Sequence, residues 1–330
     1  MPNRRMVLGH LAATLGATAG PLASRPARAQ ATAAWPARPV RLILPFPAGG
    51  GTDNSARMLA EAITRQTQQA AVVENRPGAN GLIAAQAAAA AAPDGYTFFI
   101  TSMSTQSVNP HVIKKLPYDP IKDFAPVARM TMSYLLLVVR NTDDQPRTYA
   151  ELVARARASG RMNYGSGNTS SRVGAEVWKA KEKLEVAYVA YQGIPQGLND
   201  LIGGQIDVMF PDLSPAVPLV KAGKLRALAV SSPERLQILP DVPTVIEVGL
   251  PEAALTTWSA CYAPAGTPRP IIDRMAGIVR ESLESKDVQD AQAKLGTKAA
   301  PSSPDELAEF TRSEFETWGR AIRMAGIEPE

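Results

Sequence analysis

Three consecutive glycines, Gly49 to Gly51, follow a short apolar run and precede a helical pattern. Glycine has no Cβ, so the backbone N–H groups of such a segment can approach a ligand closely. The first amides of the helix lack intrahelical acceptors, and the helix dipole favours a negative charge beside them. Thr52 or Asp53 is expected to cap the helix. The segment predicts an anion cradle, and the alternative is a plain strand-to-helix connection.

The cradle lacks residues that two nucleotide-binding motifs require. A phosphate-binding P-loop contains Gly-Lys followed by Ser or Thr, but no lysine lies between Gly49 and Arg57. A dinucleotide fingerprint needs a third glycine for close helix packing, and Asn54 occupies that position. We therefore expect a smaller anion, such as a carboxylate.

The ionisable side chains give little support to catalysis. Beyond residue 29 the chain has one histidine, His111, and one cysteine, Cys261. A cysteine–histidine pair or a multi-histidine metal site is therefore hard to build. Carboxylate catalysis by Asp53, Asp207 or Asp212 is the alternative, although capping and loop formation are simpler roles. We expect no enzyme, no metal and no organic cofactor.

Alternating strand and helix patterns place the cradle in an α/β protein. Short apolar runs separated by helical stretches are typical of a parallel, doubly wound sheet. About 300 residues exceed one ordinary core, so two lobes are expected. Strands are predicted at 40–45, 71–74, 97–102, 135–139, 162–166, 186–190, 206–210, 225–230 and 258–262. Helices are predicted at 52–67, 82–92, 149–158, 171–181, 195–202, 216–222, 271–284, 288–295 and 304–325.

The first 29 residues have the features of a secretory signal peptide. Arg4 and Arg5 precede a weakly apolar run, and Ala27-Arg28-Ala29 offers small residues for cleavage. Both the general secretory route and the twin-arginine route fit this pattern. These residues hold four of the 35 basic residues and none of the 31 acidic ones, so the exported remainder has no net charge. The charge balance therefore gives no support to nucleic-acid binding.

Seven motifs, in their order and spacing, resemble the receptors of tripartite tricarboxylate transporters, also called Bug-type solute-binding proteins. The motifs are PFPAGGGTD (45–53), VENRPGA (73–79), PDGYT (93–97), NYGS (163–166), DLIGGQID (200–207), KAGKLRALA (221–229) and LPDVPT (239–244). The resemblance implies a periplasmic-binding-protein-like fold of type II, with two doubly wound lobes around a ligand cleft and two crossover segments. It implies lobe 1 at 30–130 plus 255–330 and lobe 2 at 131–254. It also implies a periplasmic protein, expected to be a monomer, that delivers a small carboxylate to a membrane permease.

Ligands of open α/β sheets bind beyond the carboxyl ends of the strands. Glycines and hydroxyls gather in four loops at such positions, although each Ser or Thr there has the alternative role of a helix cap. Together with the resemblance, these loops and the segment at 210–212 predict a ligand site. Its residues are Phe46, Pro47, Ala48, Gly49, Gly50, Asp53, Ser102, Ser104, Thr105, Ser166, Gly167, Ser170, Ser171, Arg172, Tyr191, Gly193, Phe210 and Asp212.

Two positions depart from the family's pattern. Arg172 stands where many relatives have histidine; it suits a second ligand carboxylate if it points into the cleft, and a solvated surface arginine is the alternative. Pro211 stands where relatives often carry an aspartate that can bind a ligand amino group, and Asp212 is displaced by one residue. We therefore expect non-amino carboxylic acids as ligands. The alternatives to transport are a sensor that presents the solute to a membrane kinase and an exported hydrolase.

Overall fold

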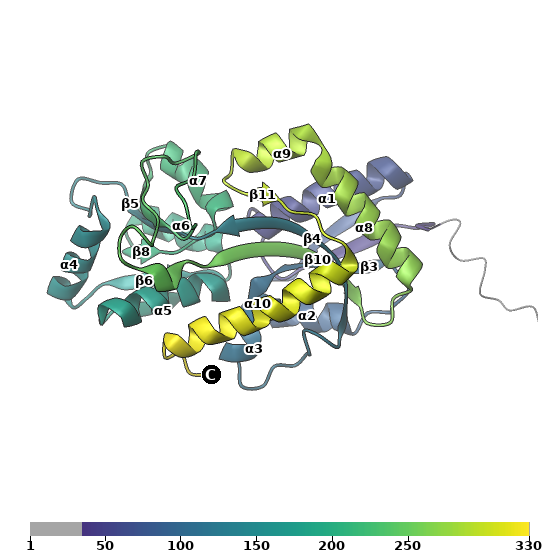
Figure 1. Cartoon of the computed structure of the whole chain (residues 1–330), viewed down its shortest axis with the longest axis horizontal. Coiled ribbons are helices and arrows are strands. Elements are labelled where there is room, and N and C mark those ends of the chain that lie inside the picture. The colour runs from purple at the N-terminus through teal and green to yellow at the C-terminus, as the bar shows by residue number, and fades with distance from the viewer. Residues whose placement is uncertain (1–34, 330) are drawn as a thin grey trace, which may run out of the picture. The chain divides into compact units, whose positions relative to one another are not determined.

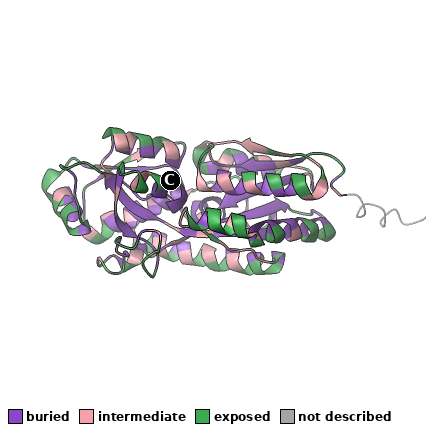
Figure 2. Cartoon of the chain, turned by 90° about the horizontal axis from the view of Figure 1, so that it is seen from above, coloured by how far each residue is buried: buried purple, intermediate pink, exposed green. Residues whose placement is uncertain are grey.

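The computed structural model describes residues 35–329, which belong to one compact unit. The predicted signal peptide, 1–29, lies outside the described residues. Two β-sheets with helices packed against them make up this unit (Figure 1), so the predicted α/β class is confirmed. Buried residues fill the central strands and the inner helix faces, and exposed residues follow the outer helix faces (Figure 2). Within 35–329, no helix is long and apolar enough to cross a membrane.

The first sheet contains β1 (Val40–Leu44), β2 (Ala71–Asn75), β3 (Thr97–Ser102), β4 (Phe124–Tyr134), β10 (Thr256–Pro264) and β11 (Lys298–Ala299). Its strand order is β2-β1-β3-β10-β4-β11. β1 pairs in parallel with β2 and β3, whereas β10 runs antiparallel to both β3 and β4. The carboxyl ends of β1 and β3 therefore meet at the same edge of this sheet.

The second sheet contains β5 (Leu136–Arg140), β6 (Asn163–Ser166), β7 (Ala187–Ala190), β8 (Val208–Met209) and β9 (Leu225–Val230). Its strand order, β7-β6-β8-β5-β9, repeats the plan of the first sheet. β6 is parallel to β7 and β8, whereas β5 is antiparallel to β8 and β9. The carboxyl ends of β6 and β8 therefore also lie together.

Both sheets are mixed: each contains the parallel strands of the predicted doubly wound pattern and antiparallel strands as well. β5 and β10 run antiparallel to their neighbours, and each is the first strand that the chain forms after it passes from the other sheet. A parallel strand needs a long crossover, usually a helix, to return the chain to the starting edge. β5 follows β4 after a single residue, Leu135, and has no such crossover. The doubly wound pattern therefore holds for the parallel strands of each sheet and not for the two strands that join the sheets.

The helices agree with the predicted ones to within about three residues at nearly every end. They are α1 (Gly51–Thr67), α2 (Leu82–Ala89), α4 (Tyr149–Ser159), α5 (Thr169–Glu182), α6 (Ile194–Gly203), α7 (Leu213–Lys221), α8 (Arg269–Glu284), α9 (Lys286–Ala293) and α10 (Pro304–Met324). The short α3 (Asn109–Val112) was not predicted. Asn168 starts α5 two residues early because its side-chain oxygen accepts a hydrogen bond from Ser171 N at 2.8 Å, which is the usual role of an N-cap asparagine.

The two passages between the sheets are tied together by one hydroxyl. Ser231 Oγ accepts a hydrogen bond from Leu135 N at 2.8 Å and donates one to the Leu255 carbonyl oxygen at 2.6 Å. Leu135 lies between β4 and β5, and Leu255 directly precedes β10. Because both passages share this partner, the strands that connect the sheets are held in register with each other.

Candidate functional site

The segment predicted to be an anion cradle, Gly49–Gly51, forms the start of α1. Gly50 is the N-cap residue and has an extended backbone, with no side chain capping the helix, so the prediction that Thr52 or Asp53 caps α1 is wrong. The first amides of any helix have no intrahelical acceptor, and here no side chain of the N-cap residue accepts from them either. Gly49 has φ of +87°, a left-handed conformation that favours glycine over any other residue.

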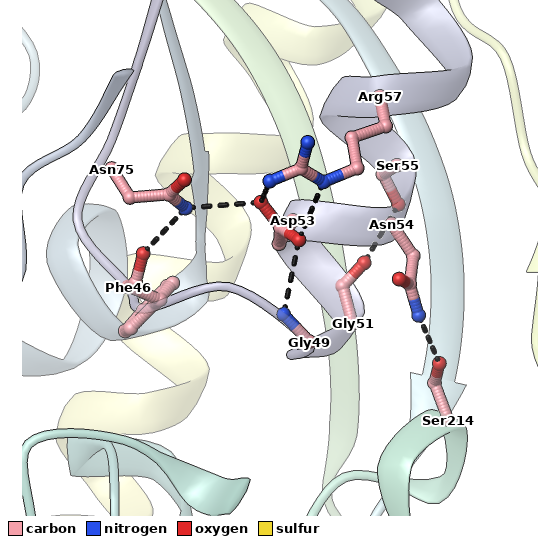
Figure 3. A network of polar contacts seen from close by, with 9 residues as sticks. All are labelled: Phe46, Gly49, Gly51, Asp53, Asn54, Ser55, Arg57, Asn75 and Ser214. Atoms are coloured by element: carbon pink, nitrogen blue, oxygen red, sulfur yellow. Dashed lines mark hydrogen bonds and ion pairs between the residues drawn. The ribbon is translucent and has the colours of Figure 1, made fainter. Parts of the chain in front are cut away.

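The Asp53 carboxylate fixes the cradle loop by a hydrogen bond to its backbone (Figure 3). One carboxylate oxygen accepts hydrogen bonds from Gly49 N at 3.0 Å and Arg57 Nε at 2.9 Å. The other accepts from an Arg57 guanidinium nitrogen at 3.1 Å and from Asn75 Nδ2 at 3.0 Å, and Asn75 also donates to the Phe46 carbonyl at 2.9 Å. Burial opposes ionisation, but these hydrogen bonds outweigh it and lower the pKa of Asp53. Asp53 is 2% exposed and has no free acceptor for a ligand, so it positions the loop.

Three further helices begin opposite the cradle. Asn168, Gly193 and Asp212 are the N-cap residues of α5, α6 and α7. Asn168 Nδ2 donates a hydrogen bond to Asp212 Oδ2 at 3.0 Å, which joins two of these caps. A Cβ placed on Gly167 would lie 2.1 Å from the Gly193 carbonyl carbon. Only glycine at 167 therefore allows the α5 and α6 loops to meet.

Two adjoining cavities lie among these helix starts. The smaller, about 20 Å³, is lined by Phe46, Pro47, Gly50, Gly51, Thr52, Gly167, Asn168, Ile194, Pro195 and Asp212; we call it the four-helix cavity, because α1, α5, α6 and α7 all begin at it. The larger, about 60 Å³, is the strand cavity. Its lining comes from α1, the strands β3, β4 and β10, and the ends of α7 and α9: Gly51, Thr52, Asn54, Ser55, Met58, Ser102, Met103, Thr131, Ser133, Asn168, Asp212, Ser214, Thr257, Trp258, Ser259, Gln292, Leu295 and Thr297.

The cavities share the start of α1 and the Asn168–Asp212 pair. Asp212 is the one ionisable side chain among the residues that line them, and no Lys, Arg or His of the described chain joins it there. Burial raises the pKa of Asp212 to about 6, despite hydrogen bonds from Asn168 and Thr257 that lower it. The walls therefore offer neutral hydrogen-bond donors and helix N-termini to an anion, together with one acid that can hold a proton near neutral pH.

The comparisons with known proteins decide the family. The model of the tripartite tricarboxylate transporter family receptor matches residues 55–327. The chain belongs to this receptor family. The structures similar to it include the periplasmic binding protein BugD.

Three solved structures resemble the receptor along nearly their whole length. An R. palustris protein with adipate is 31% identical, with a TM-score of 0.86 and coverage of 90% of this chain and 100% of that one. MatC from Rhodopseudomonas palustris, with bound malate, is 31% identical with a TM-score of 0.83, covering 87% and 100%. The periplasmic binding protein BugD is 28% identical with a TM-score of 0.85, covering 90% and 100%. The predicted periplasmic-binding-protein-like fold is thereby confirmed.

The receptor brings a third of the predicted ligand residues to the two cavities. Phe46, Pro47, Gly50, Ser102, Gly167 and Asp212 line one or both. Gly193 packs directly against Pro47, since its Cβ would lie 2.2 Å from Pro47 Cγ. Ala48 and Gly49 are exposed in the cradle loop. The remaining residues have other contacts, described next.

Several predicted ligand residues are occupied by internal contacts. Ser104 and Ser170 face each other with 3.2 Å between their Oγ atoms. The backbone amide of Ser171 donates to Asn168, whereas its buried Oγ makes no hydrogen bond. Thr105 contacts Thr101 because the predicted loop after β3 folds into a buried π-helical turn, Ser104–Val108. Two more residues make hydrogen bonds: Ser166 Oγ donates to Tyr188 Oη at 3.2 Å, and Tyr191 Oη donates to Asp200 at 2.8 Å. The Arg172 guanidinium lies 4.8 Å from the centre of the Tyr188 ring. The ring of buried Phe210 packs against Trp178, with 6.2 Å between the ring centres.

Arg172 is thus placed against an aromatic ring and not on either cavity wall. Sequence reasoning also missed residues that do line the cavities. Asn168 carries a recognisable signal, an asparagine directly before a helical pattern. The hydroxyls of Thr131, Ser133 and Thr257 carry none, because β4 was not predicted and β10 was predicted without its first residues. Gln292 lies in a mainly polar helix, and nothing in the sequence distinguishes it from the other polar residues there.

Proposed function

We propose that this receptor captures a small carboxylate between two lobes and delivers it to a tripartite tricarboxylate-type membrane permease. Lobe 1 comprises residues 30–130 and 255–330, and lobe 2 comprises 131–254. Removal of the signal peptide, 1–29, delivers the mature monomer to the periplasm. The closest support for a carboxylate comes from the similar structures that hold adipate and malate.

The convergence of four helix N-termini carries this proposal. Each N-terminus favours a nearby anion by roughly 0.3–1 kcal/mol, and more where water is excluded. The starts of α1, α5, α6 and α7 all line the same cavity. Backbone amides at these starts hold a carboxylate without a cationic side chain. The site therefore selects for charge and shape, which suits a receptor that releases its ligand again.

Closure supplies the signal to the permease. A ligand that contacts both lobes binds the closed form better than the open form, and only this difference shifts the population. Contacts between the lobes already fit a closed form: Thr169 Oγ1 donates to Asn109 Oδ1 at 2.6 Å, and Asn54 Nδ2 donates to Ser214 Oγ at 3.4 Å. The ligand adds to these weak contacts and makes closure favourable.

Titration calorimetry of the mature protein against carboxylic acids tests capture. Malate, succinate and adipate should give saturable binding, and an absence of binding across a wide panel of carboxylates would contradict the proposal. Pull-down from membranes with and without the bound acid then identifies the partner. A permease retained with ligand supports delivery, whereas a kinase supports the sensor alternative.

Gly50→Val is expected to abolish carboxylate binding while the protein still folds. Gly50 has φ of −81° and ψ of 167°, which a β-branched residue adopts readily. A Cβ there meets only the Pro47 carbonyl oxygen, at 3.8 Å, so the larger side chain extends into the four-helix cavity. Gly50→Ala is the matched control and should retain most of the affinity in calorimetry. Unchanged affinity in Gly50→Val would show that the cradle does not contact the ligand.

A further inference from the structure

The strand cavity contains a buried amide that has no partner in the protein. Gln292 on α9 is 4% exposed, and neither its Oε1 nor its Nε2 makes a hydrogen bond. Ser133 on β4 is 7% exposed, and its Oγ is likewise unpaired. Both residues line the strand cavity and neither lines the four-helix cavity. A buried polar group without a partner is costly and calls for an explanation.

The backbone fixes Gln292 in this place. Its carbonyl oxygen accepts hydrogen bonds from Thr297 N and Thr297 Oγ1, both at 3.0 Å, and from Leu295 N at 2.9 Å. The chain then pairs with β4 through Lys298 and Ala299. The turn therefore anchors the end of α9 to the strand that carries Ser133, and the two unpaired groups belong to one rigid wall.

Within residues 35–329, the wall of the strand cavity offers no cation to a second charged group of the ligand. The strand cavity is lined by hydroxyls, by the amides of Asn54, Asn168 and Gln292, and by one acid, Asp212. An ionised group would face that acid with no cation on the wall to balance it. A carboxamide offers both donors and an acceptor, which matches an uncharged group that itself donates and accepts. The volume of about 60 Å³ has room for a few water molecules, and so for a short polar end of a ligand.

We propose that the strand cavity is a subsite for an uncharged polar end of the ligand, recognised by Gln292 and Ser133. The inference rests on the proposed function, because the carboxylate at the other end occupies the cradle. Gly51 and Thr52 line both cavities, so one small molecule spans them. The ligand class is a carboxylic acid that carries a hydroxyl or a carboxamide at its far end.

Pairs of acids that differ in one group test the subsite. Calorimetry compares 4-hydroxybutyrate with butyrate, 6-hydroxyhexanoate with hexanoate, and adipamate with hexanoate. In at least one pair the acid with the hydroxyl or carboxamide should bind about tenfold more tightly than its partner. Gln292→Leu should reduce that preference to less than about twofold and leave the partner's affinity unchanged. Gln289→Leu, at an exposed position of the same helix, should leave both affinities unchanged.

Stability separates recognition from a structural role. Replacing an unpaired buried amide by leucine should maintain or raise the melting temperature, whereas a structural Gln292 would lower it. Ser133→Ala provides a second variant with the same expected loss of preference. The subsite is wrong if acids bind but the two members of every pair have the same affinity, or if both variants keep the preference. Either result leaves the proposed capture of a carboxylate intact. If no acid in the series binds, the proposed function itself fails together with the subsite.

Discussion

Gly193→Ala should weaken carboxylate binding by about 10- to 100-fold and leave the unfolding of the ligand-free protein nearly unchanged. Gly193 caps α6 in lobe 2, and a Cβ there would lie 2.2 Å from Pro47 Cγ and 2.6 Å from Pro47 Cδ in the cradle loop. Overpacking of this kind costs about 1–3 kcal/mol. The backbone of Gly193 is extended, with φ of −170°, and within lobe 2 the added Cβ meets Gln196 Oε1 at 3.1 Å, the end of a flexible side chain that can move away. The clash therefore acts only when the lobes approach.

The control for this variant lies on the same helix. Gly203→Ala places a Cβ that meets nothing within 4 Å, so its affinity should match that of the unmodified protein and its stability should be equal or slightly higher, since alanine favours a helix. Calorimetry gives the affinities, urea unfolding gives the stabilities, and small-angle scattering with and without ligand reports closure. Gly193→Ala should fail to contract on addition of ligand. Full affinity in this variant would mean that ligand capture does not need Pro47 and Gly193 to meet.

Local patterns predicted the parts of the fold that local residues determine. The apolar runs of β3 and β9 gave their bounds to the residue, and the glycines marked the start of α1. β4 was not predicted because its polar residues face partners far along the chain: Thr131 Oγ1 lies 2.7 Å from Ser259 Oγ. A hydroxyl whose partner lies 128 positions away has no local signature. Local patterns therefore failed to predict β4, a strand of eleven residues.

The candidate site shows the same division. Gly50 and Asp212 were predicted and do line the cavities, because a glycine loop and an acid after a strand are visible in the sequence. Asp53 was assigned to the ligand, although Arg57 stands four residues later, at a spacing that allows an ion pair along a helix. Asn75, which completes the network on Asp53, comes from β2 and is brought near only by strand pairing. The direction of the Asp53 side chain therefore depends on contacts between residues that are distant in the sequence, and local patterns do not predict such contacts.

Asp212→Asn should stabilise the ligand-free protein above pH 7, by at most about 3 kcal/mol. Burial raises the pKa of Asp212 to about 6 from an ordinary value of 3.8, and each unit corresponds to about 1.4 kcal/mol. Between these two values the folded protein holds a proton that the unfolded chain has lost. The free energy of unfolding therefore falls as the pH rises through this window and levels off above it. Asparagine does not titrate, so the variant does not lose this stability. Urea unfolding should give a higher free energy of unfolding for Asp212→Asn than for the unmodified protein at pH 8, and similar values at pH 4.

The same variant should abolish most of the pH dependence of carboxylate binding. Two unit charges about 5 Å apart repel by about 3 kcal/mol at an effective dielectric constant of about 20, so a bound carboxylate favours the protonated form of Asp212. Two other charged groups of the predicted site are engaged elsewhere: Asp53 pairs with Arg57, and Arg172 lies over Tyr188. Affinity for malate or adipate should fall as the pH rises above about 6 in the unmodified protein and stay nearly constant in Asp212→Asn.

Amino acids provide the opposing outcome. An ionised Asp212 would attract a ligand ammonium group, so glutamate or aspartate would bind more tightly as the pH rises, and Asp212→Asn would lose that binding. Calorimetry at pH 5, 6, 7 and 8 with malate and with aspartate distinguishes the two roles. Tighter binding of aspartate at pH 8 would contradict the expected preference for non-amino acids. It would also show that displacing the acid to position 212 preserved its contact with an amino group.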